Sequence, residues 1–419
     1  MYHVFIYNNV FKLFSFFKGM RKYKVAVVDD NPIHFRVPLH RKFFENKQID
    51  SVVYFFTMDD CSKRYQYETK KNNGFNLDLS GFEYRLLRNY CPFTKKLPPY
   101  RLWNFGIIWE IVNGNYDAVI LYGYSSFGKK LAYLGALLSG TPVIFREEIN
   151  EISGGKLKVF FKKFLYKILF KIPQAFLCSY TKNKKFYESF GVLSEKLFLH
   201  PCAVDNKLYR ELAKGVDKKK VRKKLRIPED ANVFLSVGTI DARKNSFGLL
   251  KAFEKLGGDK NYLIYLGEGL DKKKIQRYIE DNRVENVKFF KFEHNYDKVA
   301  EYYSVADIFV IASVSDPSPK ALNEAMNFSL PVIVSDGVGT AFDLVKNEKN
   351  GFVCKKSNIE ELSKCMIKII SDKKRMKDMG KESLRIVSKW NFDEDIKATL
   401  KALDYVCDDE IKLRGKYIG

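Results

Sequence analysis

The chain has 419 residues, of which 46% are hydrophobic and 29% are charged, and this length is enough for two domains with separate cores. The net charge of +23 favours anionic partners such as nucleotides, nucleic acid or an anionic membrane, although a lysine-rich solvated surface also explains much of it. The 7 cysteines are scattered without a CxxC pair and the 5 histidines form no cluster, which argues against a disulfide framework or a zinc site.

The first residues, MYHVFIYNNVFKLFSFFKGM, are aromatic and apolar. They are too short and too interrupted for a membrane span, and they lack the basic start and the cleavage site of a signal peptide. Two hypotheses concern this extension, residues 1–19: either Met20 is the true start, or the extension is a helix that seeks a surface. The first is preferred, because RKYKVAVVDD follows directly and has the pattern of a first strand.

Short runs that are apolar throughout recur along the chain, and stretches of helical length separate most of them. Such runs are typical of strands buried on both faces of a parallel sheet. They lie at 24–30, 117–123, 141–147, 175–180 and 196–201, and again at 233–238, 262–269, 287–292, 308–313 and 330–336. The alternation predicts an α/β chain with two Rossmann-like domains that face each other across a cleft, with ligands beyond the carboxyl ends of the strands.

The predicted boundary between the domains follows HPCAVDNKLY. The next segment is DKKKVRKKLRIPED, in which Asp217 is the expected N-cap of a helix. This gives an N-terminal domain at 20–205 and a C-terminal domain at 206–390. Residues 391–419 are expected to form a C-terminal helix that packs back on the N-terminal domain.

The segment GKLKVFFKKFLYKILFKIP is an unusual predicted helix, because lysines stand at 156, 158, 162, 163, 167 and 171. One apolar face, expected to pack on its own domain, holds Leu157, Phe161, Phe164, Leu165 and Ile168. A second strip, rimmed by lysines, holds Val159, Tyr166 and Phe170. Either this strip dips into an anionic membrane through Lys156–Lys171, or both faces are buried and the lysines extend to solvent. Nucleic acid is not expected, because no known reading motif accompanies the charge.

Two segments in the second half carry polar groups at strand ends. In FLSVGTIDARKN a strand ends at Gly238, and Arg243 and Lys244 supply cations that suit a diphosphate, although a turn with two solvated bases is the alternative. In SDPSPKALNEAMNF a helix N-terminus suits phosphate. There Glu324 could accept ribose hydroxyls and Asp316 sugar hydroxyls. On composition alone, the preferred interpretation is a loop carboxylate at Asp316 and a surface helix residue at Glu324.

The stretch SDPSPKALNEAMNFSLPVIVSDGVGTAFDLVKNEKNGFV resembles the signature of the family-4, glycogen-synthase-like glycosyltransferases. The shared features are two acids, at 316 and 324, followed by EAM, PVI and NGF. Upstream, SVGTIDARKN resembles the phosphate loop of the family, and PCAVDNKLY resembles its interdomain linker. The resemblance is specific over most of 196–403 and looser over 24–180, where only NPIHFRVPLHRKF and PVIFREE are similar.

The resemblance implies the glycosyltransferase B fold, a nucleotide-diphospho-sugar donor, no metal or other cofactor, and a transfer that retains the anomeric configuration. The N-terminal domain would bind the acceptor, a lipid-linked glycan or a surface polysaccharide, in the cytoplasm or at the inner face of the cell membrane. The alternative is a non-catalytic protein that binds nucleotide sugars or polyanions. A nicotinamide dehydrogenase is disfavoured, because no GxGxxG follows a strand.

The matching positions give the candidate site residues. The candidate catalytic residues are Lys244, Asp316, Glu324 and Glu148. The candidate donor-binding residues are Gly238, Thr239, Arg243, Lys244, Phe292, Asp316, Ser318, Lys320, Ala321, Leu322 and Glu324.

Four positions depart from the family pattern. Asp316 replaces the usual glutamate, and Pro319, which has no N–H to donate, stands where a glycine is usual. Thr239 stands where an arginine is often found, with Arg243 as its candidate substitute. The segment 146–148, Arg-Glu-Glu, occupies the region where many members have a histidine; for Glu148 a structural role is weighed above contact with a substrate. Lys320 is the candidate source of the charge or donor lost at Pro319.

Overall fold

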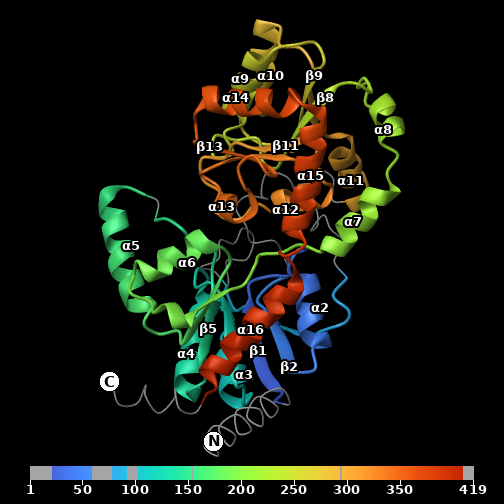
Figure 1. Cartoon of the computed structure of the whole chain (residues 1–419). Helices are drawn as coiled ribbons and strands as arrows, with labels where there is room; N and C mark the ends of the chain where they lie inside the picture. The colour runs from blue at the N-terminus through green and yellow to red at the C-terminus, as the bar shows by residue number, and fades with distance from the viewer. Residues whose placement is uncertain (1–20, 59–77, 92–101, 153, 293–294, 409–419) are drawn as a thin grey trace, which may run out of the picture.

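The computed structural model describes residues 21–58, 78–91, 102–152, 154–292 and 295–408. They form two bodies, each built on one parallel sheet, which Figure 1 shows one above the other. The predicted α/β class with two Rossmann-like sheets is therefore confirmed. The predictions for residues 1–19 and for the end of the chain beyond residue 408 lie outside the described residues.

The first sheet has seven strands in the order β3-β2-β1-β4-β5-β6-β7, all parallel. Its strands are β1 (Tyr23–Asp29), β2 (Ile49–Phe55), β3 (Glu83–Leu86), β4 (Ala118–Tyr122), β5 (Val143–Arg146), β6 (Ala175–Cys178) and β7 (Leu197–Leu199). The helices between them are α2 (Val37–Glu45), α3 (Gly106–Asn113), α4 (Phe127–Ser139), α5 (Lys156–Leu169) and α6 (Thr181–Glu188), with a 3-10 turn η3 at Ser194–Lys196.

The second sheet has six parallel strands in the order β10-β9-β8-β11-β12-β13. They are β8 (Asn232–Val237), β9 (Asn261–Leu266), β10 (Val287–Phe290), β11 (Ile308–Ile311), β12 (Val332–Ser335) and β13 (Gly351–Cys354). The helices of this half are α7 (Asn206–Gly215), α8 (Lys218–Lys224), α9 (Ser246–Leu256), α10 (Lys272–Asn282), α11 (Tyr296–Val305), α12 (Lys320–Asn327), α13 (Ala341–Leu344), α14 (Ile359–Ile370), α15 (Lys373–Val387) and α16 (Phe392–Val406).

Every apolar run that was predicted as a strand contains one. Three strands were not predicted: β2, β3 and β13. The run IDSVVYF of β2 has the same character as the others, whereas β3 is an exposed edge strand, EYRL, without an apolar pattern. The predicted N-cap at Asp217 is confirmed, because its carboxylate accepts hydrogen bonds from the N–H groups of Lys219 and Lys220.

The last helix of the described residues, α16, lies on the first sheet although it follows the second sheet in the sequence (Figure 1). It contacts β6, β7 and α2. Tyr23 in β1 donates a hydrogen bond of 2.5 Å to Asp404, and His200 Nδ1 lies 2.9 Å from Asp395 Oδ1 in a fully buried pair. The chain therefore crosses between the two bodies twice, after β7 and before α16, and both crossings are packed.

The helix α5 is turned opposite to the prediction. The face that was expected to pack on the domain is exposed, with Leu157 71%, Phe161 61% and Phe164 62% accessible. Tyr166 and Phe170, from the strip that was expected to face a membrane or be covered, are 7% and 5% exposed and pack among the aromatic rings of Phe145 and Phe176. These two rings fill the space beside β5 and β6.

A close approach of two loops fixes the carboxyl ends of β8 and β9. Gly267 has φ +156, and a Cβ added there would lie 1.9 Å from the carbonyl oxygen of Gly238. Only a residue without a side chain fits at that position.

We expect Gly267→Ala to lower the free energy of unfolding by about 2–3 kcal/mol, because the methyl group forces the two backbone segments apart. Urea unfolding measures this loss. The matched control is Gly106→Ala at the start of α3, where an added Cβ meets nothing within 4 Å and the expected change is small or slightly stabilising. Equal stability of the two variants would contradict the close approach.

Candidate active site

The carboxyl ends of both sheets lie toward the junction of the two bodies, and the candidate residues gather there. The loop after β5 contacts the loop after β11, because Ser315 donates a hydrogen bond of 2.7 Å to Glu151. The helix after β6 contacts the segment after β12, because Thr181 donates to Asp343 through both its backbone N–H and its hydroxyl. The two strand edges that carry ligands in such folds therefore face each other, as predicted.

Asp316 is held by the two cations of the β8–α9 loop. Lys244 Nζ donates a hydrogen bond to its carboxylate, and Arg243 Nη1 lies 3.7 Å from the same oxygen. Asp316 is only 5% exposed, and its backbone is fixed by a bridge to Val338. A buried carboxylate needs such pairing to be tolerated. The structure thus brings Lys244, Arg243 and Asp316 together.

The rest of the β8–α9 loop is shaped around these cations. Asp241 accepts hydrogen bonds from the Thr239 hydroxyl at 2.8 Å and from the Lys244 backbone N–H at 2.8 Å. Gly238 lies beside the Lys244 side chain, since a Cβ there would be 3.4 Å from Lys244 Cε. Arg243 also donates to the Thr239 hydroxyl and to the Ser315 carbonyl oxygen. Arg243 therefore reaches the neighbourhood of Thr239, where the family often has an arginine.

Glu324 lies one turn inside α12 and is buried, at 7% exposure. The interpretation as a surface helix residue is therefore wrong. Tyr303 donates a hydrogen bond of 2.6 Å to Glu324 Oε2, and the Tyr209 hydroxyl also bonds to this carboxylate. Burial raises the pKa of Glu324, while the bonds from Tyr303 and Tyr209 oppose that rise. The hydrogen bonds from these two hydroxyl groups thus fix the orientation of the Glu324 carboxylate, which acts as a hydrogen-bond acceptor.

The N-terminus of α12 lies between these two acids. The helix begins at Lys320 after Pro319, and no side chain caps its first turn. The free N–H groups of a first turn and the helix dipole favour an anion there. Ser318 is 8% exposed and Leu322 is fully buried against the core, so the turn itself is rigidly held. Ala321, which is partly buried, packs against the same core.

Phe292, the remaining candidate, follows β10 and packs as a partly buried side chain against the main core. Its place among the donor-binding residues stays a prediction.

Lys320 points across the junction into the other body. Its ammonium donates to the Cys202 thiol at 2.5 Å and to Ser318 Oγ at 3.1 Å, and it lies 3.7 Å from Glu148 Oε1. It also lies 4.9 Å from the centre of the Phe35 ring. The lysine beside Pro319 thus connects the helix of the second sheet to the loops of the first.

Glu148 is the centre of this cluster on the first body. It accepts a hydrogen bond of 2.7 Å from the Cys202 thiol and lies 3.5 Å from Arg146 Nη2. Although burial opposes its ionisation, the charges of Lys320 and Arg146 lower the pKa of Glu148 to about 2. The neighbouring Glu147 behaves in the opposite way, since burial raises its pKa to about 7.

Sequence reasoning did not find several residues of this cluster. Cys202 lies in the PCAVDNKLY segment that was quoted only as a linker, and burial raises the pKa of its thiol. Phe35 and Tyr209 lie in the quoted segments NPIHFRVPLHRKF and PCAVDNKLY, but neither was assigned a role, and Tyr303 lies outside the quoted motifs and reaches Glu324 only through folding. The one available signal was the position of Cys202 directly after a predicted strand end.

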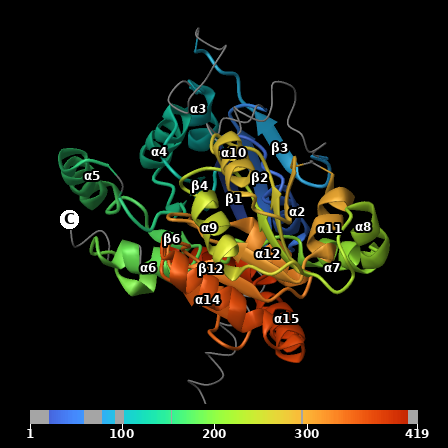
Figure 2. The same ribbon diagram turned by 90° about the horizontal axis from the view of Figure 1, so that it is seen from above.

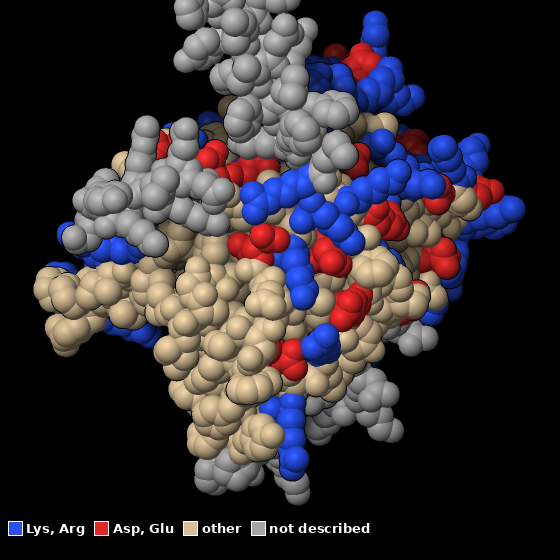
Figure 3. Space-filling model, turned by 90° about the horizontal axis from the view of Figure 1, so that it is seen from below, with Lys and Arg blue, Asp and Glu red and all other residues tan. Residues whose placement is uncertain are grey.

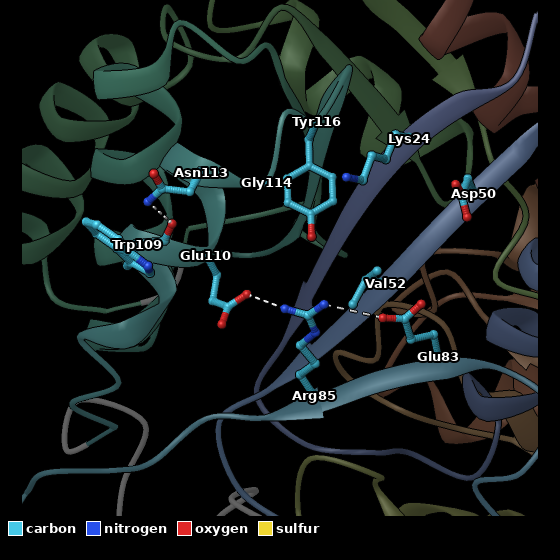
Figure 4. Close-up of a pocket in the computed structure, with 10 residues that line it drawn as sticks. All are labelled: Lys24, Asp50, Val52, Glu83, Arg85, Trp109, Glu110, Asn113, Gly114 and Tyr116. Carbon is cyan, nitrogen blue, oxygen red and sulfur yellow. Dashed lines mark hydrogen bonds and ion pairs between the residues drawn. The ribbon is translucent and has the colours of Figure 1, made fainter.

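A separate cavity of about 500 Å³ lies at the amino ends of β1 and β2, away from the strand edge that carries the candidate site. Figure 4 shows Arg85 between two carboxylates, with Glu110 at 2.6 Å and Glu83 at 3.5 Å. Trp109 and Tyr116 complete its wall. Because it lies at the opposite strand edge, the cavity does not belong to the candidate active site.

The described residues offer neither a metal-binding cluster nor a membrane-spanning helix. They contain no group of three or more His, Cys, Asp or Glu side chains arranged to hold a metal ion. Among their helices, none combines the length and the apolar character that crossing a membrane would need.

Residues 217–385 match the family model described as glycosyl transferases group 1. This segment holds Lys244, Asp316, Lys320 and Glu324, the residues that the structure gathers at the junction. The chain is a member of the group 1 glycosyltransferases. The fold is accordingly the glycosyltransferase B fold, with two Rossmann-like sheets.

The curated relatives include proteins whose names refer to lipids. The α-monoglucosyldiacylglycerol synthase of Acholeplasma laidlawii is 30% identical over 207 residues, which are 45% of this chain and 50% of that protein. An α-1,4-N-acetyl-D-galactosaminyltransferase of Campylobacter jejuni, named for an undecaprenol-linked substrate, is 24% identical over 250 residues, 57% of this chain and 61% of that protein. The matches span about half the length of the curated relatives.

A solved structure of the Anabaena protein HepE, in complex with UDP and glucose, is similar to nearly the whole chain. The TM-score is 0.65 at 14% identity, and the match covers 90% of this chain and 98% of that one. At this identity the likeness establishes the fold.

The opposite pKa shifts of the adjacent glutamates predict opposite effects of pH on stability. A group whose pKa is lower in the folded state than in the unfolded state stabilises the fold at pH values above its unfolded-state pKa. The contribution of Glu148 to stability is therefore complete at neutral pH and falls as the pH approaches 2. We expect the destabilisation caused by Glu148→Gln to shrink by about 2 kcal/mol between pH 6 and pH 3. Urea unfolding of both proteins across this range measures it.

Glu147→Gln is the matched control on the next residue. The pKa of Glu147 is higher in the folded state than in the unfolded state. Its contribution to stability is therefore complete at pH values below the unfolded-state pKa and is lost as the pH rises through about 7. We therefore expect this variant to gain stability relative to the unsubstituted protein between pH 5 and pH 8. Parallel pH profiles of the two variants would contradict the charge environment described for Glu148.

Proposed function

We propose that the chain is a retaining glycosyltransferase that moves a sugar from a nucleotide-diphospho-sugar to a lipid-linked or surface-polysaccharide acceptor. One observation carries the proposal: a helix N-terminus lies between a cation-paired carboxylate, Asp316, and a buried acceptor carboxylate, Glu324. That order of groups suits a sugar, a diphosphate and a ribose in succession. Membership in the group 1 family supports the same assignment.

In this proposal Glu324 holds the ribose. Its carboxylate already accepts a bond from the Tyr303 hydroxyl, and ribose hydroxyls have the same donor chemistry. The first turn of α12 and the Lys244 ammonium receive the diphosphate, which suits a cation and free N–H groups. Asp316 then accepts hydroxyls of the sugar.

The chemical step breaks the bond between the sugar carbon and the diphosphate oxygen and forms a bond to an acceptor hydroxyl, which loses its proton. Negative charge grows on the departing diphosphate. Lys244 and Arg243 are fixed beside that position, and preorganised charge stabilises such a transition state without rearrangement. The retention of anomeric configuration and the independence from metal are parts of the proposal that come from the family.

Lys320 is proposed to supply positive charge where Pro319 has no N–H. Its ammonium, at present beside Glu148 and Cys202, starts from the first residue of α12 and has the reach to turn toward a diphosphate at the helix N-terminus. Glu148 would then be released toward the acceptor side of the junction. The catalytic assignment of Glu148 is proposed in this sense only.

The acceptor class is proposed from the relatives. The Acholeplasma laidlawii synthase is named for a glucosylated diacylglycerol product and the Campylobacter jejuni transferase for an undecaprenol-linked substrate, and both names support a lipid-linked acceptor here. An acceptor of that kind places the protein at the cytoplasmic face of the cell membrane, as a peripheral protein. Uridine nucleotides are the first donors to test, since HepE was solved with UDP.

A non-catalytic binder of nucleotide sugars remains the second candidate function, because Pro319 and Asp316 both depart from the family pattern. It requires the same donor contacts but no turnover. Donor binding and turnover therefore have to be measured separately.

We expect Lys244→Ala to lower kcat/KM for sugar transfer or donor hydrolysis by at least about 100-fold, because the leaving diphosphate loses its main counter-charge. Glu324→Gln is expected to weaken donor binding by about tenfold or more. Steady-state kinetics and calorimetry measure these two effects. The control is Lys255→Ala, since Lys255 is a half-exposed lysine on α9 that pairs with Glu360. Donor binding that survives without any turnover in the unsubstituted protein would favour the binder instead.

We expect UDP-sugars or another nucleotide sugar to raise the thermal unfolding temperature of the protein, and Glu324→Gln to remove most of that shift. The same measurement in a chelator tests independence from metal, and the shift and the turnover should both remain. No response to uridine, guanosine or adenosine diphosphate sugars would count against a donor site at α12.

A further inference from the structure

The outward face of α5 is the largest apolar feature that the proposed reaction does not use. Six large apolar side chains on this 14-residue helix are between 47% and 71% exposed. They are Leu157, Phe160, Phe161, Phe164, Leu165 and Ile168. Isolated exposed apolar residues are ordinary, but a contiguous set of this size marks an interaction surface.

The orientation of α5 is fixed by its other side. Tyr166 stacks on Phe170 with ring centres 5.1 Å apart, and Phe170 lies 5.1 Å from the ring of Tyr187. Together with Phe145 and Phe176 these rings form a closed core cluster. The helix cannot rotate to hide its outward face without opening that cluster, so the exposure is a property of the folded state.

The apolar surface continues beyond α5. On α4 three leucines at helical spacing, Leu134, Leu137 and Leu138, are 44%, 59% and 66% exposed, and on α3 Trp109 is 72% exposed. Figures 1 and 2 show α5 projecting from the lower body on one side. Figure 3, seen from below, shows a broad uncharged area that runs from this projection across the base of the body, with lysines and arginines at its margin. We call this area, α5 with the exposed residues of α4 and α3, the basal face.

The charge around α5 is of one sign. Six lysines stand in or directly after the helix, and the sequence from Ile152 to Tyr187 contains no aspartate or glutamate. A face of aromatic and aliphatic side chains with a rim of ammonium groups matches the boundary of an anionic bilayer, where rings enter the acyl layer and lysines reach the phosphates. A second copy of the chain would bring the same lysines against each other, so like charges oppose that occupant.

We propose that the basal face docks on an anionic lipid bilayer, with α5 lying in the plane of the interface. The occupant is a membrane surface and not a spanning environment, since α5 has 14 residues. This inference corrects which side of the helix meets the lipid: the side is Phe161 and Phe164, and Tyr166 and Phe170 hold the helix to the protein.

The docking also bears on how an acceptor would reach the junction, and this step rests on the proposed function. The chain from Glu148 to the first residue of α5 is short, and Glu151 within it bonds to Ser315 of the other body. A membrane held at α5 is therefore close along the chain to the acceptor side of the candidate site. A lipid-linked acceptor would reach the junction from that side.

The test is vesicle flotation of the full chain without any nucleotide sugar, so that it is independent of turnover. We expect binding to phosphatidylcholine vesicles that contain phosphatidylglycerol, and little binding to phosphatidylcholine alone. Phe161→Ser with Phe164→Ser should lower the partition coefficient about tenfold or more, and Lys163→Gln with Lys167→Gln should lower it for anionic vesicles only.

The matched control is Phe342→Ser with Ile367→Ser, since these side chains are 61% and 47% exposed on the other body. It should leave vesicle binding unchanged, and thermal unfolding should show that all variants fold. Equal binding by the Phe161 and Phe164 variant, or no binding by the unsubstituted protein, would overturn the proposal. So would a dimer in sedimentation velocity that this variant dissolves, because it would assign the face to a second copy. Donor hydrolysis, measured separately, decides the proposed function.

Discussion

The contact of Lys320 with Glu148 and Cys202 is the interaction on which the arrangement of the site depends. It places a cation from the first turn of α12 into a pocket of the other body that is buried and holds a carboxylate and a thiol. A buried charge is tolerated only when it is paired, and each partner here belongs to a different sheet. The two bodies therefore share one electrostatic requirement, and separating them would leave the Lys320 ammonium without its carboxylate and Glu148 with Arg146 as its remaining cation.

The need to pair buried charges also explains why the cations of the candidate site contact carboxylates. Every cation expected to meet a diphosphate is already paired with a carboxylate: Lys244 and Arg243 with Asp316, and Lys320 with Glu148. A diphosphate entering at the helix N-terminus would exchange one set of anionic partners for another. The cost of desolvating those cations has thus been met during folding, which is the condition for electrostatic preorganisation.

The sequence allowed the fold to be predicted because buried parallel strands leave a strong record. Runs such as VFLSVG and IFVIAS are apolar on both faces, and each was found as a strand. The edge strand β3 escaped because EYRL is exposed and has no such record. The donor-side residues Lys244, Asp316 and Glu324 could be chosen by resemblance, but the burial of Glu324 could not, because it depends on Tyr303 and Tyr209 from distant helices.

The α5 helix illustrates why a periodic pattern predicts two apolar strips on a helix but not which of them faces the domain. Both of its strips are apolar, so the sequence allowed either to face the domain. Packing decided it: Tyr166 and Phe170 complete a cluster of rings from β5, β6 and α6, and this cluster holds their strip against the domain. Cys202 was missed for a related reason, since its role arises only where a linker meets α12.

The position of α5 in the chain gives this orientation its wider meaning. The helix follows β5 and the loop that carries Glu147, Glu148 and Glu151, so it is built on the same strand end that pairs with Lys320. In the proposed docking, a force applied to α5 would act first on the first body beside the junction, and it would reach α12 only through contacts such as that of Glu148 with Lys320. Under that proposal, the proposed acceptor side would be held at a lipid surface while the second sheet would keep the contacts proposed for the donor. That separation of tasks follows from which strand each loop leaves, and it requires no contact beyond those already present in the fold.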